Sequence, residues 1–238
     1  MLNQFKAKAR QYLNFYPMIE CKKEFKQQKF IQFNERPVEL SFLFGKISEL
    51  YPKKILDVGT GDTALPHLIR NCGALVTATD NIWDYWPAGM FNRHYYIVND
   101  DIRNTQLKDT FDLITCISVL EHIEHPDKAV RNMFSLLSPG GHLIITCPYS
   151  ENEYIRNVYE LPGSSYGRDF AFITQSFSRA ELEQWLLENE AVILDQEYWQ
   201  FWSGRHWTVG TQIIPPKKVT AKDTHQLTCI MMAKTSKS

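Results

Sequence analysis

Short apolar runs alternate with helix-length stretches through the middle of the chain, and this alternation limits the possible folds more than any other feature. The runs lie at residues 54–58, 75–79, 95–98, 111–117 and 142–147. A helix between two strands carries the chain back so that the strands pair in parallel. We therefore predict an α/β fold built on a parallel sheet.

Further elements are predicted before and after this core. Apolar residues recur at helical spacing ahead of Pro17, namely Phe5, Ala9, Tyr12, Leu13 and Tyr16. This spacing indicates an amphipathic N-terminal helix, and a second helix is expected over 38–50. Ser178 and Glu181 form the capping box of another helix. Residues 191–199 and 227–233 are predicted as closing strands, and residues 215–218 as a turn.

Composition limits the classes of partner. The chain has 238 residues, 44% of them hydrophobic, which suits one domain with one sizeable core. Its formal net charge is -1, so no overall basic field attracts nucleic acid or an anionic membrane. Acidic residues outnumber basic ones 23 to 13 over 37–216, and both ends are basic. An acidic body suits a cationic ligand, although the basic ends are also typical of solvated surface segments.

Targeting and redox signals are weak. The first residues lack the apolar region of a signal peptide, and no run is long enough for a membrane span. The five cysteines are scattered, odd in number and without a C-x-x-C pair. We therefore expect a cytoplasmic protein without a membrane partner or a thiolate metal site.

The strongest local feature is a glycine turn between a strand and a helix. Gly59 and Gly61 allow a ligand to approach the backbone closely. With Asp80 about 20 residues on, the same pattern also fits a dinucleotide fingerprint. However, Asp57 and Asp62 would repel a pyrophosphate and attract an ammonium or a sulfonium. The acids favour S-adenosylmethionine, and Asp62 is also expected to cap the following helix.

At this point the sequence resembles the class I S-adenosylmethionine-dependent methyltransferases of the small-molecule type, over roughly residues 53–148. Five elements carry the resemblance in the family's order: Asp-Val-Gly-Thr-Gly at 57–61, Ala-Thr-Asp at 78–80, Asn-Asp-Asp-Ile at 99–102, Phe-Asp-Leu-Ile at 111–114 with Val-Leu-Glu-His at 119–122, and Ser-Pro-Gly-Gly at 138–141. One departure is Thr63, which stands where the family usually has a third glycine.

The resemblance implies a Rossmann-like architecture. We expect a doubly wound, mostly parallel, seven-stranded sheet with helices on both faces and an N-terminal helical extension. The chain should form a single domain over 1–238. Its expected parts are a helical cap at 1–50, a cofactor-binding core at 53–148, and two substrate-side inserts at 149–177 and 198–223.

The resemblance also implies roles for individual residues. Gly59 and Gly61 would line the methionine part of S-adenosylmethionine, and Asp57 would orient its ammonium directly or through water. The other expected cofactor contacts are Asp80 on the ribose hydroxyls with Asn81 beside it, Ile82 or Trp83 on the adenine ring, Asp101 and Ile102 at the adenine amino group, and Ser118 near the sulfonium. The alternative for Asp80 and Asp101 is a cap or turn role.

Candidate catalytic residues lie after the fourth predicted strand and in the inserts. His122 is a candidate general base or acceptor-orienting group, because an imidazole titrates near neutral pH. The alternative is that Glu121 and His122 pack beneath the cofactor loop. Glu124 and His125 complete a cluster that resembles a metal site, but no metal is predicted because Pro126 makes the turn irregular.

The aromatic residues outside the sheet are expected to surround the methyl acceptor. One set lies in 149–177, a length suited to a lid, and another in 198–207. Tyr149 and His206 are the candidate catalytic residues there, although a core position is the better interpretation for alternate members of the second set such as Trp199 and Phe201. The N-terminal helix, with Tyr12, Tyr16 and Phe33, would close the site, and Arg36 would meet the cofactor carboxylate.

The sequence therefore predicts a methyltransferase acting on an oxygen or nitrogen of a small molecule, with a homodimer as its candidate assembly. Three alternatives stay open. They are an RNA or protein methyltransferase, a dinucleotide-dependent oxidoreductase and a non-catalytic cofactor-binding subunit. The acids at the glycine turn count against the oxidoreductase, and only the basic N-terminal segment supports an RNA or protein substrate.

Overall fold

The computed structural model describes residues 6, 15, 18, 19, 21–30, 34–86, 88–164, 167, 170 and 172–235. The chain divides into two compact units, Met1–Glu35 and Arg36–Ser238. In the first unit, residues 21–27 are helical. The five apolar residues that predict the N-terminal helix, and Phe33, lie outside the described residues. The second unit contains all the elements named below.

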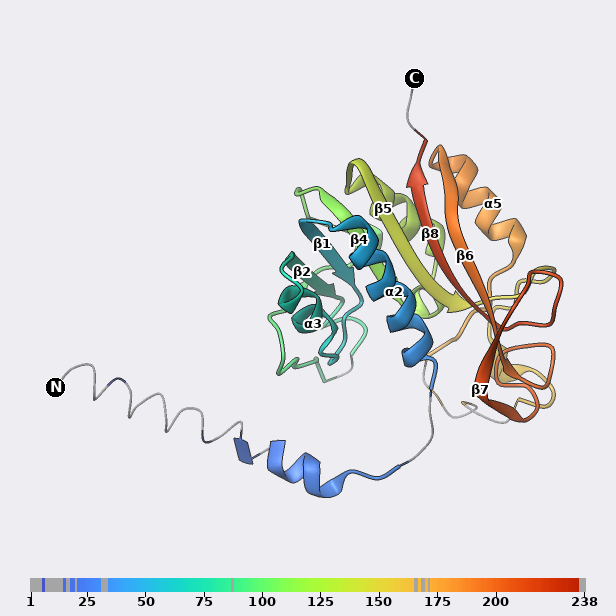
Figure 1. Cartoon of the computed structure of the whole chain (residues 1–238), viewed down its shortest axis with the longest axis horizontal. Helices are drawn as coiled ribbons and strands as arrows, with labels where there is room; N and C mark the ends of the chain where they lie inside the picture. Colours follow the sequence, from blue (N-terminus) through green and yellow to red (C-terminus); the bar gives the residue numbers. More distant parts are fainter. Residues whose placement is uncertain are drawn as a thin grey trace. The chain divides into compact units, whose positions relative to one another are not determined.

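An eight-stranded sheet forms the centre of the second unit (Figure 1). Its strands are β1 (Lys54–Val58), β2 (Leu75–Asp80), β3 (Val98–Asn99), β4 (Phe111–Ile117), β5 (Leu137–Pro148), β6 (Ala191–Trp202), β7 (Gln212–Val219) and β8 (Leu227–Lys234). Their spatial order is β3-β2-β1-β4-β5-β8-β6-β7. The first five strands pair in parallel, as predicted, and the last three pair antiparallel.

The predicted strand number of seven is wrong because β7 adds an eighth strand at the edge. The prediction placed a turn at 215–218, since proline cannot donate to a ladder. Here Pro215 and Pro216 lie between the paired residues Gln212 and Lys217, where the register with β6 shifts. β7 has no second neighbour among the strands of the sheet, so the missing N–H groups leave no ladder bond unmade.

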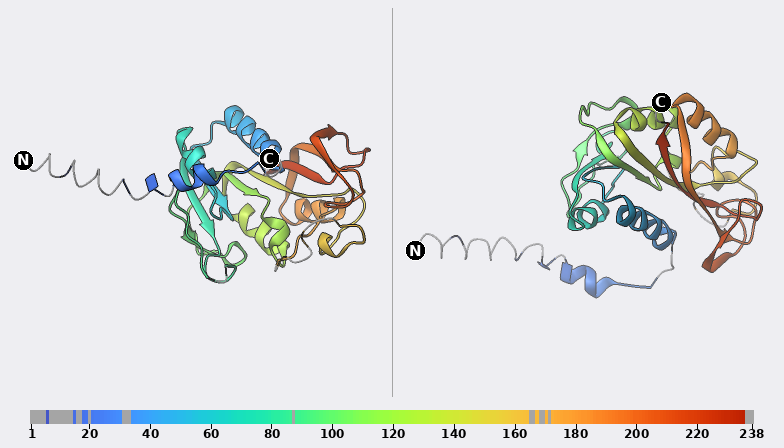
Figure 2. Two further views of the ribbon diagram at one scale, coloured as in Figure 1. Left: turned by 90° about the horizontal axis from the view of Figure 1, so that it is seen from below. Right: turned by 45° about the horizontal axis from the view of Figure 1, so that its top comes forward.

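Helices cover both faces of the sheet, as the resemblance implied (Figure 2). They are α2 (Arg36–Leu50), α3 (Leu65–Asn71), α4 (Pro126–Ser135) and α5 (Arg179–Glu188), with short 3-10 turns at η1 (Ile102–Asn104), η2 (Leu120–His122) and η3 (Val158–Glu160). Alternate residues of each strand enter opposite cores. Ile55 packs with α2 and α3, whereas its neighbour Leu56 packs with α4.

The helix starts show which local predictions hold. Ser178 and Glu181 make both hydrogen bonds of a capping box at the start of α5, as predicted. The N-cap of α3 is Ala64, so the prediction that Asp62 caps this helix is wrong. The chain instead follows a turn in which the Thr63 hydroxyl donates to the carbonyl oxygen of Thr60. Among the described helices, none combines the length and the hydropathy that crossing a bilayer requires.

Candidate functional site

The glycine turn lies where β1 ends, at the edge where the parallel strands have their carboxyl ends. Gly59 has a φ of 72° and Gly61 a φ of 59°, both in the left-handed region that favours glycine. A Cβ atom on Gly59 would lie 2.2 Å from Cγ1 of Val119. The turn therefore needs glycine at this position both for its conformation and for the space beside η2.

Asp57 supports the turn from below. Its carboxylate accepts hydrogen bonds of 2.7 Å from the hydroxyls of Thr60 and Thr115, so it connects β1 to the turn and to β4. The side chain is almost fully buried. Burial raises the pKa of Asp57 to about 6, against the lowering effects of the two hydroxyls and the Arg36 charge.

Asp80 meets the glycine turn from the end of β2. One carboxylate oxygen accepts the backbone N–H of Gly61 at 2.7 Å, and the other accepts the indole N–H of Trp86 at 3.0 Å. The predicted ribose acceptor therefore lies against the predicted methionine-binding glycine. In this structure both of its oxygens already hold a donor.

The loop after β2 covers the turn, which sequence reasoning missed. The Asn92 side-chain amide donates to the carbonyl oxygens of Gly61 and Thr63, at 2.9 and 2.8 Å. A Cβ on Gly61 would lie 3.8 Å from the Trp86 ring, so the indole rests on the turn. No sequence motif marks these contacts, because they depend on how the loop at residues 81–97 folds back, and its described residues form no helix or strand.

The predicted adenine contacts are arranged along β2 and β3. Ile82 is buried with Ala78 and Ile97, and its backbone N–H donates to the side chain of Asn99. Asn81 precedes it, and its carbonyl oxygen accepts the N–H of Tyr85. These residues place a hydrophobic wall beside Asp80.

Asp101 and Ile102 lie at the next strand end. The Asp101 side chain caps η1 and forms an ion pair with Arg103 at 2.9 Å. Burial would raise the pKa of Asp101, but hydrogen bonds from the Arg103 side chain and backbone outweigh it and lower the pKa. The alternative cap role of Asp101 is therefore confirmed, and its adenine role stays a prediction. Ile102 is buried in the core that includes α4.

Ser118 follows β4 with a φ of 49°, and its hydroxyl donates to Glu39 of α2 at 2.5 Å. Glu39 is fully buried and also accepts the Thr146 hydroxyl at 2.6 Å and the Arg36 guanidinium at 3.0 Å. Sequence reasoning missed Glu39, since a glutamate on an amphipathic helix normally faces solvent.

His122, in η2, contacts the first insert. Its Nδ1 lies 2.7 Å from the carbonyl oxygen of Ile173, and its ring packs edge-on against Phe172. A carbonyl only accepts, so Nδ1 carries the proton and Nε2 has the free lone pair. Burial lowers the pKa of His122, with a smaller contribution from the Arg36 charge, so the ring is neutral at pH 7.

Tyr149 and His206 lie on the other side of the edge. Tyr149 follows β5, is fully buried and stacks on His225 at 5.6 Å. His206 follows β6, with Nε2 3.8 Å from a carboxylate oxygen of Glu153, and burial lowers its pKa. Within the described ranges neither residue forms a hydrogen bond, an ion pair or a ring contact with His122, so the three candidate catalytic residues do not form one hydrogen-bonded unit.

In the described part of the chain, no group of three or more His, Cys, Asp or Glu side chains could hold a metal ion.

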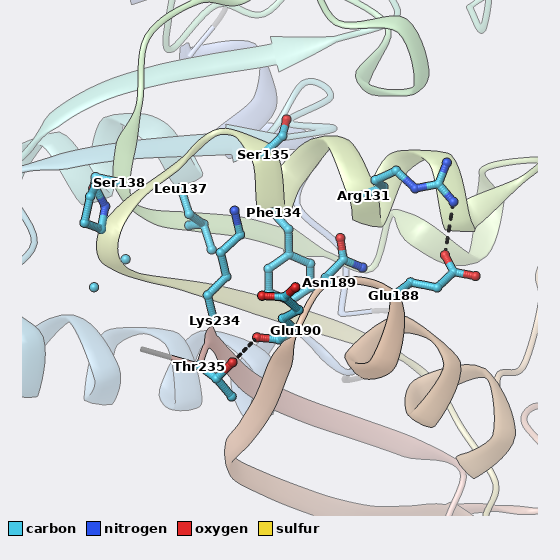
Figure 3. A pocket seen from close by; sticks show the side chains of 13 residues that line it. Arg131, Phe134, Ser135, Leu137, Ser138, Glu188, Asn189, Glu190, Lys234 and Thr235 are labelled. Carbon is cyan, nitrogen blue, oxygen red and sulfur yellow. Dashed lines mark hydrogen bonds and ion pairs between the residues drawn. The ribbon is translucent and has the colours of Figure 1, made fainter. Parts of the chain in front are cut away.

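A pocket of about 630 Å³ lies at the opposite edge of the sheet, where β5 begins and β8 ends (Figure 3). Its rim carries the Arg131–Glu188 ion pair and the Thr235 hydroxyl on the Glu190 carbonyl oxygen. None of its lining residues belongs to the predicted site.

Comparisons with known proteins agree with this geometry. A family model described as a methyltransferase domain matches residues 27–196. The chain is 30% identical over 119 residues to a ubiquinone biosynthesis O-methyltransferase from Aeromonas salmonicida, covering 46% of this chain and 49% of that protein. A protein of the same name from Coxiella burnetii is 28% identical over 174 residues, 67% of this chain and 71% of that protein.

Solved structures share the fold. The 1,6-didemethyltoxoflavin-N1-methyltransferase of Burkholderia thailandensis has a TM-score of 0.56 and 16% identity, covering 97% of this chain and 90% of that chain. At that identity the likeness concerns the fold alone. The matched part of this chain spans about half the length of the Aeromonas salmonicida relative.

Proposed function

The chain belongs to the family of methyltransferase domains, and on this premise we propose that it transfers a methyl group from S-adenosylmethionine to an oxygen or nitrogen of a small-molecule acceptor. The observation that carries the proposal is the contact between Asp80 and the glycine turn at Gly61. The names of the curated relatives support oxygen as the acceptor atom.

The side chains at the turn fit the methyl donor. A ribose presents hydroxyl donors, and Asp80 already accepts one N–H donor from Trp86 on the oxygen that would receive them. Gly59 and Gly61 would line the methionine part. Asn81 and Ile82 would flank the adenine, with Asp101 and Ile102 at its amino group.

The charges at the turn also favour this ligand over a dinucleotide. The charge of Asp80 acts on Asp57, so the two carboxylates lie close enough to interact electrostatically. Each of them would repel an anion bound at the turn. A pyrophosphate would have to occupy this acidic turn, whereas a sulfonium and an ammonium are attracted to it. Mixing the protein with NADH and following its fluorescence distinguishes the oxidoreductase alternative.

The bound donor supplies a methyl group activated by the positive charge on sulfur. The protein must hold the acceptor in line with that methyl group and remove the acceptor's proton. We assign proton removal to Nε2 of His122, which is neutral and has its lone pair free because Nδ1 donates to Ile173. Ser118 would contribute its backbone near the sulfonium, since its hydroxyl is held by Glu39.

The inserts at 149–177 and 198–223 would form the acceptor pocket. His122 already contacts the first insert through Ile173 and Phe172. The Tyr149 hydroxyl and Nδ1 of His206 are buried and have no hydrogen-bond partner among the described residues. Both atoms are candidates for orienting polar groups of the acceptor.

Two finer expectations belong to this proposal. All five cysteines are free thiols, which supports a reducing compartment and hence the cytoplasm. The homodimer stays a prediction, and sedimentation velocity measures it. An RNA substrate is tested by salt-dependent retention on RNA.

Isothermal titration with S-adenosylhomocysteine tests the proposed function. We expect the wild-type chain to bind this product and Asp80→Ala to lose at least about tenfold in affinity, because a charged hydrogen-bond acceptor is removed. Asp223→Ala is the matched control, since Asp223 is exposed and bonds only Thr220 and its own turn. Absence of binding by the wild-type chain at millimolar ligand would refute the proposal.

A further inference from the structure

A buried carboxylate on α2 connects this helix to the ends of two strands. Glu39 is fully buried, although its helix lies on the outside of the sheet. A buried charge is costly unless it is paired and its oxygens are hydrogen-bonded. The contacts of Glu39 therefore identify what it holds in place.

The two oxygens of Glu39 hold different groups. Oε1 accepts the hydroxyls of Ser118 and Thr146, at 2.5 and 2.6 Å, and Oε2 accepts the Arg36 guanidinium at 3.0 Å. The Thr146 hydroxyl oxygen in turn accepts the backbone N–H of Ser118 at 3.0 Å. Oε1 therefore holds the turn after β4 in place, and Oε2 holds the guanidinium of Arg36.

The contact with Glu39 holds Arg36 at the end of β4. Its guanidinium also donates to the carbonyl oxygen of Ile117 at 3.1 Å, the last residue of β4. Its charge lowers the pKa of both Asp57 and His122, so it lies within electrostatic reach of the glycine turn and of the candidate base. About 36% of the Arg36 side chain is exposed, whereas Glu39 is inaccessible.

We propose that Glu39 is a positioning residue that holds the Arg36 guanidinium over the end of β4, so that Arg36 receives the carboxylate of the methionine part of the methyl donor. This inference rests on the proposed function. Glu39 itself does not touch the ligand. It neutralises one side of the guanidinium, and the Arg36 side chain is exposed enough for a second carboxylate to reach it.

Two ligands separate positioning from general support of the fold. S-adenosylhomocysteine carries the amino-acid carboxylate, whereas 5′-methylthioadenosine retains the adenosine and the thioether but lacks the amino acid. We expect Glu39→Gln to weaken binding of the first ligand by about tenfold or more and of the second by less than about twofold. Glu49→Gln on the same helix is the control, because Glu49 is exposed and pairs only with Lys46.

Coupling with Arg36 provides the second test. If Glu39 acts through Arg36, then Arg36→Ala shows the same ligand-selective loss, and the double variant loses little more than either single one. Glu39→Asp keeps the buried charge but withdraws the carboxylate by one methylene. It therefore provides the test if Glu39→Gln fails to fold, and we expect it to lose affinity selectively for S-adenosylhomocysteine.

The outcomes are distinguishable. An equal loss for both ligands, additive effects of the two substitutions, or wild-type affinity in Glu39→Asp would overturn the positioning role. If the wild-type chain binds neither ligand, the proposed function itself fails.

Discussion

At Gly59, backbone conformation and packing both demand the same residue. We predict that Gly59→Ala lowers the free energy of unfolding by about 1–3 kcal/mol more than Gly140→Ala, because only the first substitution adds a clash to the strain of a positive φ. Gly140 is a matched control, with a φ of 77° and nothing within 4 Å of an added Cβ. Urea unfolding measures both variants, and equal losses would contradict the clash with Val119.

Asp57 predicts a pH dependence of stability. Its pKa rises from an ordinary value of 3.8 to about 6 on folding, so between these values the native state binds more protons than the unfolded chain. The contribution of Asp57 to the free energy of unfolding therefore falls as the pH rises through this range, by about 3 kcal/mol.

Asp57→Asn removes that contribution, keeps one oxygen as an acceptor for one of the Thr60 and Thr115 hydroxyls, and presents an amide N–H to the other hydroxyl oxygen. Urea unfolding of both proteins at intervals from pH 4 to 7 measures the difference. The wild type should lose its advantage over the variant as the pH rises. Parallel stability curves would contradict a raised pKa.

Some single residues could be read from the sequence and others could not. The roles of Gly59 and Gly61 follow from local backbone geometry, which a strand-glycine-helix pattern reveals. Glu39 and Trp86 act through contacts with residues 79 and 6 positions away, and the partners are set by tertiary packing. Asp101 has a neighbour, Arg103, that competes for the same carboxylate, which the motif alone does not show.

Among elements, the loop between β2 and β3 should control access to the turn. Trp86 occupies the Asp80 oxygen that the ribose needs, so binding must exchange one donor for another. We predict that Trp86→Phe binds S-adenosylhomocysteine several-fold more tightly, because no indole N–H has to be displaced. Isothermal titration measures the affinity.

Tyr96→Phe is the control for this prediction. Tyr96 lies in the same loop, is 82% exposed and has no assigned contact with the cofactor or with Asp80. Its replacement should leave the affinity unchanged. If Trp86→Phe binds more weakly than the wild type, the indole supports the ligand and does not compete with it.

Strands and helices were predictable where their signals are local. The capping box of α5 and the five parallel strands follow from spacing and alternation. β7 was not predicted, because its prolines indicate a turn. A strand with prolines is acceptable there only because β7 lies at the edge of the sheet.

On the scale of the whole molecule, the candidate chemistry lies at one edge of the sheet. The ends of β1, β2, β4 and β5 supply the turn, Asp80, Ser118 and Tyr149, and the pocket of Figure 3 lies at the other edge. Ligands of open α/β sheets bind at the carboxyl ends of the strands. The acidic charge of residues 37–216 is consistent with a cationic methyl donor there.

The acceptor side is where sequence reasoning reached least far. The alternate spacing in 198–207 predicted a core position for Phe201, which is confirmed, but the aromatic spacing in 149–177 did not show which rings face the core. Phe177 and Phe201 are buried in the two main cores, and Phe172 packs against His122. Such choices depend on long-range packing, which a periodic pattern does not encode.

A crystal structure of the full chain with S-adenosylhomocysteine tests the central claim most directly. The account predicts the ribose hydroxyls within about 3 Å of the Asp80 carboxylate, the thioether above Gly59 and Gly61, and the indole of Trp86 displaced from Asp80. A ligand bound elsewhere, with the Trp86 N–H still on Asp80, would contradict it.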